Sequence, residues 1–443
     1  MKETESPLEE KAVNNFIFLL TAVNTLNFFD RQLFGVITEP LRFEWQLSDF
    51  QIGFLATAFT LLYAVVGLPI GYLADRFPRQ TILRVGLFCW SLLTALCGFA
   101  WNFWSLFLLR LGVGVGEASC APAATSLIGD LVPSPYRARA LSVFMIGLPL
   151  GSALSYSLGG FLAGRFGWRS PFFIAGMAGL PLALFWKTVS EKRKKDPIFY
   201  SARQEGITAR NALGHLWRLP AFRWIIVSGA IHNFNLYALS AFLPAFLIRY
   251  HQLDIKTAGF VTGLAYAALG GVGMILGGHA ADRLTVMKNR SASRLFIAFC
   301  STLLSVPFLF MALSCKAQNI GLFALYMAPA ALLLYVYYPS IYASIQDIVP
   351  SCILATAMAF YFLVMYCMGA SLGPAVVGWL SDYFRERSMP PFTRGPIPNL
   401  LWAKGLQRAM YLVPALNILL VFVLGMATLA AGRSKNKKEE GTE

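Results

Sequence analysis

Two related stretches decide the fold class of this sequence: Gly71-Tyr-Leu-Ala-Asp75-Arg76-Phe-Pro-Arg79 and, 207 positions further on, Gly278-His-Ala-Ala-Asp282-Arg283-Leu. Each follows a long apolar run. A second pair, Asp130-Leu-Val-Pro133 and Asp347-Ile-Val-Pro350, is separated by 217 positions. Similar offsets for two independent pairs indicate an internal repeat. Two parallel repeats are typical of membrane transporters whose substrate site lies between the halves.

The composition places the chain in a membrane. Of its 443 residues, 57% are hydrophobic and 13% are charged, which does not fit a soluble chain. Twelve spans of about 22 residues leave roughly 180 positions for loops and tails, so we expect no separate soluble catalytic domain. The predicted fold is all-α, with twelve transmembrane helices near residues 13–37, 51–75, 79–100, 103–129, 138–164, 168–189, 222–248, 257–281, 293–314, 319–346, 353–379 and 407–431.

The distribution of positive charge predicts the orientation and the domain boundary. The net charge is +15; with both termini cytoplasmic, the cytoplasmic loops and tails carry 24 of the 37 Lys and Arg, and the exterior loops 11. Nine of them lie between Lys187 and Arg223. We therefore predict an N-terminal six-helix bundle over 1–189, a cytoplasmic linker over 190–221 and a C-terminal six-helix bundle over 222–443. Binding of anionic lipid head groups is an alternative role for the basic linker.

The twelve spans, the basic central loop and the G-x-L-x-D-R-x-x-R element resemble the major facilitator superfamily over essentially the whole chain. The resemblance implies alternating access, with a cytoplasmic latch whose charges pair with the ends of neighbouring helices. A purely topogenic role for these charges is the alternative. Val286 occupies the position that matches Arg79, so the C-terminal latch is expected to be weaker. The latch residues are Gly71, Asp75, Arg76, Arg79, Asp282 and Arg283.

Three motifs narrow the resemblance to one subfamily. Asn27-Phe-Phe-Asp30-Arg31 in the first span, Arg110-Leu-Gly-Val-Gly-Val-Gly-Glu117-Ala-Ser119 in the fourth and Gly147-Leu-Pro-Leu-Gly151 in the fifth are similar to the spinster transporters of lysolipids and sphingosine-1-phosphate. The organic-anion:cation symporter branch carries a similar N-x-x-D-R and R-x-x-x-G-x-x-E pair. The resemblance thus implies a lysolipid or sphingolipid-like substrate, with a small organic anion or an amphipathic drug as the alternative.

Four ionisable residues interrupt apolar spans: Asp30 and Arg31 in the first, Arg110 and Glu117 in the fourth. Charges inside a bilayer are costly and indicate a functional site. A spacing of seven places Arg110 and Glu117 on one helix face. The four charges sum to zero, as expected of groups that compensate each other in a low dielectric. Static ion pairs between the two helices are the alternative, although the corresponding positions of the second half carry no charge.

We expect Asp30 and Glu117 to couple transport to protons. A buried carboxylate binds a proton more tightly when an arginine moves away from it, whereas arginine does not release its own proton. Arg31 is therefore expected to gate Asp30. Arg110 is expected to act as a gate or as the anchor for an anionic head group, because a guanidinium binds such a group bidentately.

Weaker candidates are polar residues inside spans, for which interhelical hydrogen bonding is an equally good account. The C-terminal spans are rich in aromatic residues and almost uncharged, which predicts an aromatic wall suited to the tail of an amphiphile. Arg249 is expected to extend to the membrane interface. The glycines of 112–116 are expected to serve close helix packing rather than nucleotide binding. The weaker candidates are Asn27, Ser119, His232, Asn233, Asn235 and Tyr237.

The sequence does not favour an enzyme. It contains no Ser-His-Asp arrangement, HExxH motif or Cys and His pairs at metal-binding spacing, so we expect no catalytic residues, metal or cofactor. The expected partners are the substrate, protons and the bilayer, without nucleic acid. We expect a monomer in the inner (plasma) membrane of a bacterium, with both termini cytoplasmic.

Overall fold

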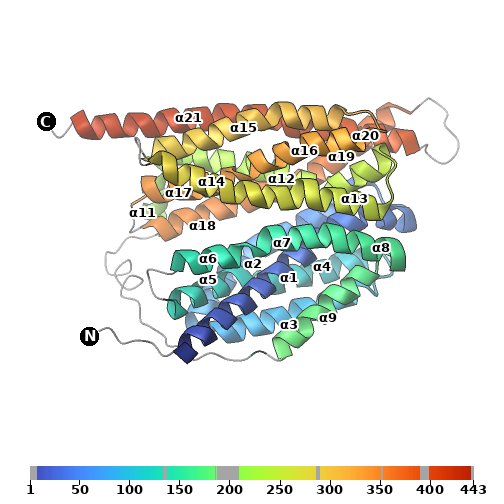
Figure 1. Cartoon of the computed structure of the whole chain (residues 1–443), viewed down its shortest axis with the longest axis horizontal. Coiled ribbons are helices and arrows are strands. Elements are labelled where there is room, and N and C mark those ends of the chain that lie inside the picture. The colour runs from blue at the N-terminus through green and yellow to red at the C-terminus, as the bar shows by residue number, and fades with distance from the viewer. Residues whose placement is uncertain are drawn as a thin grey trace. The chain divides into compact units, whose positions relative to one another are not determined.

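A computed structural model describes residues 7–132, 137–184, 186, 209–285, 290–350, 353–389 and 399–440. The described residues form helices and turns, without strands (Figure 1). Each predicted span coincides with a helix or a run of consecutive helices, so the predicted all-α fold is confirmed. Ten helical stretches of the described residues are long and apolar enough to cross a membrane, and α9 (Ser170–Leu184) is apolar but shorter.

The chain divides into two compact units. Unit 1 comprises residues 1–47, 58–195 and 254–263, and unit 2 comprises 48–57, 196–253 and 264–443. The helix α2 (Asp49–Arg76) therefore begins in unit 2 and continues in unit 1, and the span that starts with α13 (Ile255–Thr262) begins in unit 1 and continues in unit 2. The predicted bundles are continuous in sequence, so they do not include these two helix starts that group with the other unit.

Unit 1 shows how local sequence fixes a helix end close to the predicted charges. Asn102 precedes α4, and its side chain accepts a hydrogen bond from the Ser105 amide at 2.8 Å, while Ser105 Oγ accepts one from the Asn102 amide at 3.1 Å. The fourth span is interrupted after Glu117, where Ser119 Oγ donates to the Gly116 carbonyl at 2.8 Å. Besides α2, α9 and α13, the helical elements of unit 1 are α1 (Pro7–Trp45), α3 (Arg79–Cys97), α4 (Phe103–Glu117), α5 (Cys120–Leu131), α6 (Arg137–Met145), α7 (Gly147–Leu154), η2 (Ser155–Gly159) and α8 (Gly160–Phe166).

Unit 2 encloses a core of apolar and aromatic side chains, in which Phe222, Tyr337 and Tyr361 are fully buried. Pro220 lies in the first turn of α12, where its missing N–H leaves no helical hydrogen bond unmade. A short helix, α11 (Ala209–Trp217), occupies part of the predicted linker. The remaining elements are α12 (Pro220–Tyr250), η3 (Gly263–Ala268), α14 (Leu269–Thr285), α15 (Arg290–Ser314), α16 (Ile320–Tyr335), α17 (Tyr337–Ile348), α18 (Leu354–Val364), η5 (Met365–Ala370), α19 (Leu372–Arg387), α20 (Asn399–Met410) and α21 (Leu412–Glu440).

Among the described residues, three spans contain a π-helical turn: η2 in the fifth, η3 in the eighth and η5 in the eleventh. Such turns are frequent at functional sites and bend the helix that contains them. Glycines beside two of them permit close backbone contact. A Cβ on Gly151 would lie 2.9 Å from Phe28 Cβ of α1, and one on Gly369 would lie 3.1 Å from the Ala230 Cα of α12. These glycines therefore let the fifth span pack closely on α1 and the eleventh on α12.

Candidate functional site

Arg31 and Glu117 form a buried ion pair between α1 and α4. Arg31 Nη2 and Nε lie 3.2 Å and 3.3 Å from Glu117 Oε2, and Nη2 also donates to Asn27 Oδ1 at 3.4 Å. The ion pair that the structure describes joins Arg31 to Glu117, and the predicted gating of Asp30 by Arg31 stays a prediction. The weak candidate Asn27 thus contacts the guanidinium of this pair.

Asp30 and Arg110 lie in the same region of unit 1. Arg110 Nη1 donates to the Asp30 main-chain carbonyl at 3.3 Å, and Asp30 Oδ2 accepts from Thr94 Oγ1 at 3.3 Å. Asp30 and Glu117 are 0% exposed, Arg110 is 3% and Arg31 is 8% exposed. The structure therefore brings together the four charges that the sequence singled out, away from solvent and with a formal sum of zero.

Aromatic rings lie against both guanidinium groups. Arg31 Cζ is 4.2 Å from the centroid of the Tyr63 ring, and Arg110 Cζ is 4.4 Å from that of Phe59. A desolvated contact of this kind contributes up to about 2 kcal/mol, so the rings stabilise the arginines independently of the acids. Within the described part of the chain, Asp30 Oδ1 and Glu117 Oε1 are buried and accept no hydrogen bond. Each carboxylate therefore has an oxygen on which a proton can bind without displacing a donor.

The glycines of the fourth span hold α4 close to α3. A Cβ on Gly116 would lie 2.8 Å from Trp90 Cβ and 3.0 Å from the Trp90 amide nitrogen. A Cβ on Gly86 would lie 2.9 Å from Ser119 Cβ. These distances leave no room for larger side chains, and the predicted packing role of the 112–116 glycines is confirmed. Close packing also fixes the register of Arg110 and Glu117 against α3.

The weak candidates of α12 make polar contacts within unit 2. Asn233 Oδ1 accepts from the Tyr338 hydroxyl at 2.8 Å, and Asn235 Nδ2 donates to Asn417 Oδ1 at 2.8 Å. The Tyr237 ring centroid is 6.3 Å from that of Tyr366. Interhelical hydrogen bonding, one of the two accounts that the sequence left open, therefore applies to both asparagines.

His232 packs among tyrosine side chains of unit 2. Its ring stacks on Tyr337 with centroids 3.8 Å apart and meets Tyr338 edge-on at 5.2 Å. The Tyr337 hydroxyl is 2.7 Å from Ser228 Oγ and 3.4 Å from the Tyr361 hydroxyl. His232 is fully buried, and neither ring nitrogen has a hydrogen-bond partner among the described residues. Stacking rather than hydrogen bonding thus positions this side chain.

The predicted latch is described in part. Arg79 pairs with Asp130 in unit 1, and Arg294 Nη1 pairs with Asp347 Oδ2 at 2.7 Å in unit 2. Each guanidinium also donates to the main-chain carbonyl four residues before its Asp. The two aspartates are the first residues of the second repeated motif. Arg294 therefore makes in the second half the ion pair that Arg79 makes in the first, although Val286 stands at the position that matches Arg79 in the repeat. A weaker C-terminal latch stays a prediction.

The other predicted latch residues are described only in part. The side chains of Asp75, Arg76 and Asp282 lie outside the described residues. Gly71 has open space where a Cβ would project, and Arg283 is exposed. The assignment of the latch to these residues thus stays a prediction.

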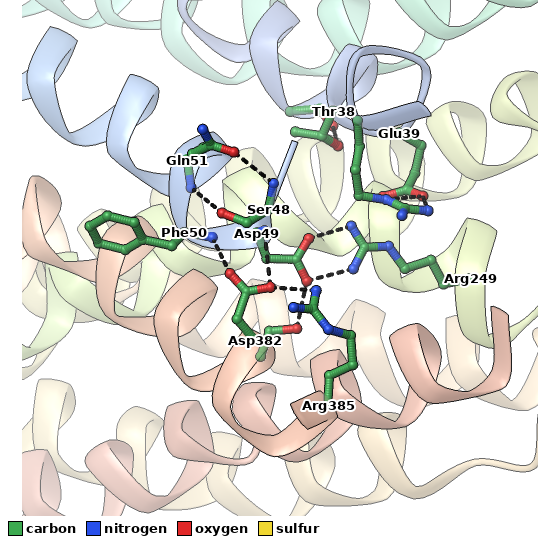
Figure 2. Close-up of polar contacts among 12 residues, drawn as sticks. Thr38, Glu39, Ser48, Asp49, Phe50, Gln51, Arg249, Asp382 and Arg385 are labelled. Carbon is green, nitrogen blue, oxygen red and sulfur yellow. Dashed lines mark hydrogen bonds and ion pairs between the residues drawn. The ribbon is translucent and has the colours of Figure 1, made fainter. Parts of the chain in front are cut away.

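Sequence reasoning missed a buried charge cluster in unit 2. Arg249, expected to extend to the interface, is 8% exposed and binds Asp49 bidentately, with Nη1 to Oδ2 at 2.7 Å and Nη2 to Oδ1 at 2.6 Å (Figure 2). Asp382 and Arg385 lie beside this pair in unit 2. These residues lie just beyond the ends of predicted spans, where charged residues are common, so their positions did not indicate a buried cluster. The Asp-x-x-Arg spacing on α19 was the one available hint.

An internal repeat, helices long and apolar enough to cross a membrane and buried, compensated charges are together typical of a membrane transporter. The sequence matches the Major Facilitator Superfamily over residues 20–374, and the chain belongs to this family. An MFS-type efflux pump of Mycolicibacterium smegmatis is 33% identical over 367 residues, which cover 82% of this chain and 83% of that protein. A probable L-galactonate transporter of Escherichia coli is 29% identical over 302 residues, covering 64% of this chain and 66% of that protein.

A solved structure supports the narrower resemblance. The crystal structure of a bacterial homologue of the human lysosomal transporter Spinster, in an inward-facing and unoccupied conformation, is 27% identical with a TM-score of 0.81. The match covers 96% of this chain and 98% of that one. The chain is thus a multi-pass membrane transporter of the spinster-like type, in a family of transporters rather than an enzyme class.

Proposed function

We propose that the chain is a proton-coupled secondary transporter of an amphipathic lysolipid or sphingolipid-like substrate. It works by alternating access of two six-helix bundles, as a monomer in the inner (plasma) membrane of a bacterium, with both termini cytoplasmic. The observation that carries the proposal is the buried group of Asp30, Arg31, Arg110 and Glu117, whose charges sum to zero while one oxygen of each acid lacks a donor.

The chemistry of the Arg31–Glu117 pair supports proton coupling. Removing Arg31 from Glu117 leaves a buried carboxylate without its counter-charge, and protonation of Glu117 removes that cost. Tyr63 and Asn27 contact Arg31 independently of the acid, so the arginine is stabilised during the exchange. Binding of a proton and loss of the ion pair are therefore linked events. Asp30 is the second proton-binding candidate. The hydrogen bond from Arg110 goes to its main-chain carbonyl rather than to its carboxylate.

The substrate class rests on two kinds of surface. Arg31 and Arg110 supply positive charge beside aromatic rings in unit 1, which suits an anionic or zwitterionic head group. Unit 2 supplies partly exposed aromatic side chains that contact one another, among them Tyr338, Tyr342 and Phe362, which suit an apolar tail. The resemblance of the three motifs to the spinster transporters of lysolipids and sphingosine-1-phosphate supports an amphiphile of this kind.

A small organic anion or an amphipathic drug is the second candidate. The E. coli relative is named a probable L-galactonate transporter and the mycobacterial relative an efflux pump. A sugar acid would use the same arginines, because its carboxylate binds a guanidinium bidentately. It has no tail, however, and would leave the aromatic side chains of unit 2 without a role.

Uptake into proteoliposomes under an imposed pH gradient tests the proposal. Lysophosphatidylcholine, sphingosine-1-phosphate and galactonate are offered side by side, with protein-free vesicles as the control for spontaneous lipid transfer. We expect gradient-dependent uptake of at least one of the two lipids. Uptake of galactonate without uptake of either lipid would replace the first candidate by the second. Uptake that is equal with and without the gradient would contradict proton coupling.

A further inference from the structure

The tenth span is interrupted at Val336, where α16 ends and α17 begins. A Cβ on Gly277 of α14 would lie 2.8 Å from the Val336 Cα, so α14 packs directly on the interruption. Tyr337 and Tyr338 follow at the start of α17, and both rings contact His232 of α12. The interruption of the tenth span thus lies next to a buried histidine within unit 2.

The ring nitrogens of His232 have unused capacity for hydrogen bonds. Neither nitrogen has a partner among the described residues, although the side chain is fully buried. Stacking on Tyr337, with an interplanar angle of 16°, covers the face of the imidazole, whereas its hydrogen bonds are directed within the ring plane. A buried polar atom without a partner costs free energy, which a phenylalanine at this position would avoid while keeping the stacked contact. Packing alone therefore does not account for a histidine here.

The polar side chains around His232 are already paired with other groups. The Tyr337 hydroxyl is 2.7 Å from Ser228 Oγ, and the Tyr338 hydroxyl donates to Asn233 Oδ1 at 2.8 Å. Each of these tyrosines therefore has a partner other than the imidazole. Among the described side chains at this place, the unmade hydrogen bonds are those of the histidine.

Tyr338 connects His232 to the partly exposed aromatic side chains of unit 2. Its ring meets His232 edge-on with centroids 5.2 Å apart and is itself partly exposed. Its centroid is 5.7 Å from that of Tyr342, which in turn lies 5.6 Å from that of Phe362. These three rings are the ones that suit an apolar tail. A single side chain, Tyr338, thus joins His232 to that surface.

The surroundings of His232 favour a neutral hydroxyl group as its ligand. Its described ring contacts are tyrosines, and a charged imidazolium would be costly in such a buried place. A neutral imidazole has one N–H donor and one acceptor nitrogen, and a hydroxyl group can pair with either. A carboxylate or phosphate can accept from the N–H only, and its charge would need a buried counter-charge. The free hydroxyl of a lysolipid or of sphingosine, between head group and tail, has the required chemistry.

We infer that His232 is a specificity-determining residue, which binds the free hydroxyl group between the head group and the tail of the substrate. Displacement of the Tyr338 ring admits the hydroxyl, and stacking on Tyr337 holds the imidazole in place. The inference rests on the proposed function, and it names the lipids that the transporter selects: those whose backbone carries a free hydroxyl.

Uptake of two matched lipids into proteoliposomes tests the inference. The probes are lysophosphatidylcholine and its deoxy analogue, in which hydrogen replaces the glycerol hydroxyl, with protein-free vesicles as the control for spontaneous transfer. His232→Phe keeps a ring that can stack on Tyr337 and removes both nitrogens. His251→Phe is the matched control, because His251 is also buried among aromatic rings of unit 2, but its Nδ1 lies 2.7 Å from the Ala317 carbonyl oxygen.

The two substitutions are expected to have opposite effects. We expect the unaltered chain to take up lysophosphatidylcholine at least about 10-fold faster than the deoxy analogue, and His232→Phe to reduce this ratio below about 2-fold by slowing uptake of the hydroxylated lipid. His251→Phe is expected to retain the ratio. In thermal unfolding in detergent, His251→Phe is expected to be less stable than the unaltered chain and His232→Phe at least as stable, because only His251 loses a described hydrogen bond.

A preference for the hydroxylated lipid that survives His232→Phe would overturn the inference, as would equal uptake of both lipids by the unaltered chain. Loss of the preference in His251→Phe as well would also overturn it, since the effect would not be specific to His232. If the unaltered chain takes up neither lipid, the proposed function is contradicted and the inference falls with it. If His232→Phe does not fold, His232→Leu removes the same nitrogens and is held to the same outcomes.

Discussion

Replacing Glu117 by glutamine keeps the shape of the side chain and removes its charge. Arg31 then remains as a cation that is 8% exposed, without its ion-pair partner. Breaking a buried pair destabilises a protein by about 3–5 kcal/mol. We expect about 3 kcal/mol, because Arg31 keeps the hydrogen bond to Asn27 and the contact with the Tyr63 ring.

The same substitution removes one proton-binding group. In proteoliposomes, Glu117→Gln is expected to abolish uptake driven by a pH gradient while retaining exchange of labelled for unlabelled substrate, which needs no net proton movement. Unfolding by denaturant in detergent gives the stability change, and the two uptake assays give the functional change. Lysophosphatidylcholine is the probe, with galactonate as the second.

Glu44→Gln is the matched control. Glu44 also accepts hydrogen bonds from an arginine, Arg169, but in an exposed pair. The hydrogen bonds from Arg169 hold the pKa of Glu44 below its usual range, so Glu44 stays ionised across an assay range of about pH 5–8 and does not titrate. We expect a stability loss below about 1 kcal/mol and unchanged pH-driven uptake. A Glu117→Gln protein with the pH dependence of the unaltered chain would refute the role of Glu117.

Two further predictions concern the latch and the glycine contacts, both measured as unfolding free energies in detergent. Asp130→Asn and Asp347→Asn are each expected to cost about 1 kcal/mol, because both break a partly exposed Arg–Asp pair. A loss of stability for Asp130→Asn alone would contradict this expectation and support a weaker C-terminal latch. Gly151→Ala is expected to cost about 1–3 kcal/mol, since its Cβ would overlap α1. Gly129→Ala, with open space around its Cβ, is expected to stabilise by up to about 1 kcal/mol, and a loss there would contradict the packing argument.

The positions of the spans could be predicted because bilayer length and apolar composition are local properties. Interruptions within them could not. The π-helical turns η2, η3 and η5 depend on how each helix packs against its neighbours, which a hydropathy pattern does not contain. The exchange of helix starts between units had no sequence signal either, since residues 48–57 read as the ordinary beginning of a span.

The α1 and α4 charges could be predicted because an ionisable residue is conspicuous in an apolar span. Their pairing was harder: Arg31 is as close in sequence to Asp30 as possible, yet its described ion pair is with Glu117, 86 positions away. The Asp49–Arg249 pair joins residues 200 positions apart. Arg294 was missed because it lies 215 positions after Arg79 (294 − 79 = 215), an offset that matches neither of the two motif pairs. A search for a basic residue opposite Asp347 would have found it.

The central claim is that protonation of the buried acids accompanies transport. A pH-sensitive dye inside proteoliposomes measures proton movement directly, when lysophosphatidylcholine is added outside without an imposed pH gradient. We predict that substrate uptake by the unaltered chain changes the internal pH, and that Glu117→Gln removes this change. Substrate uptake by the unaltered chain with constant internal pH would contradict the account.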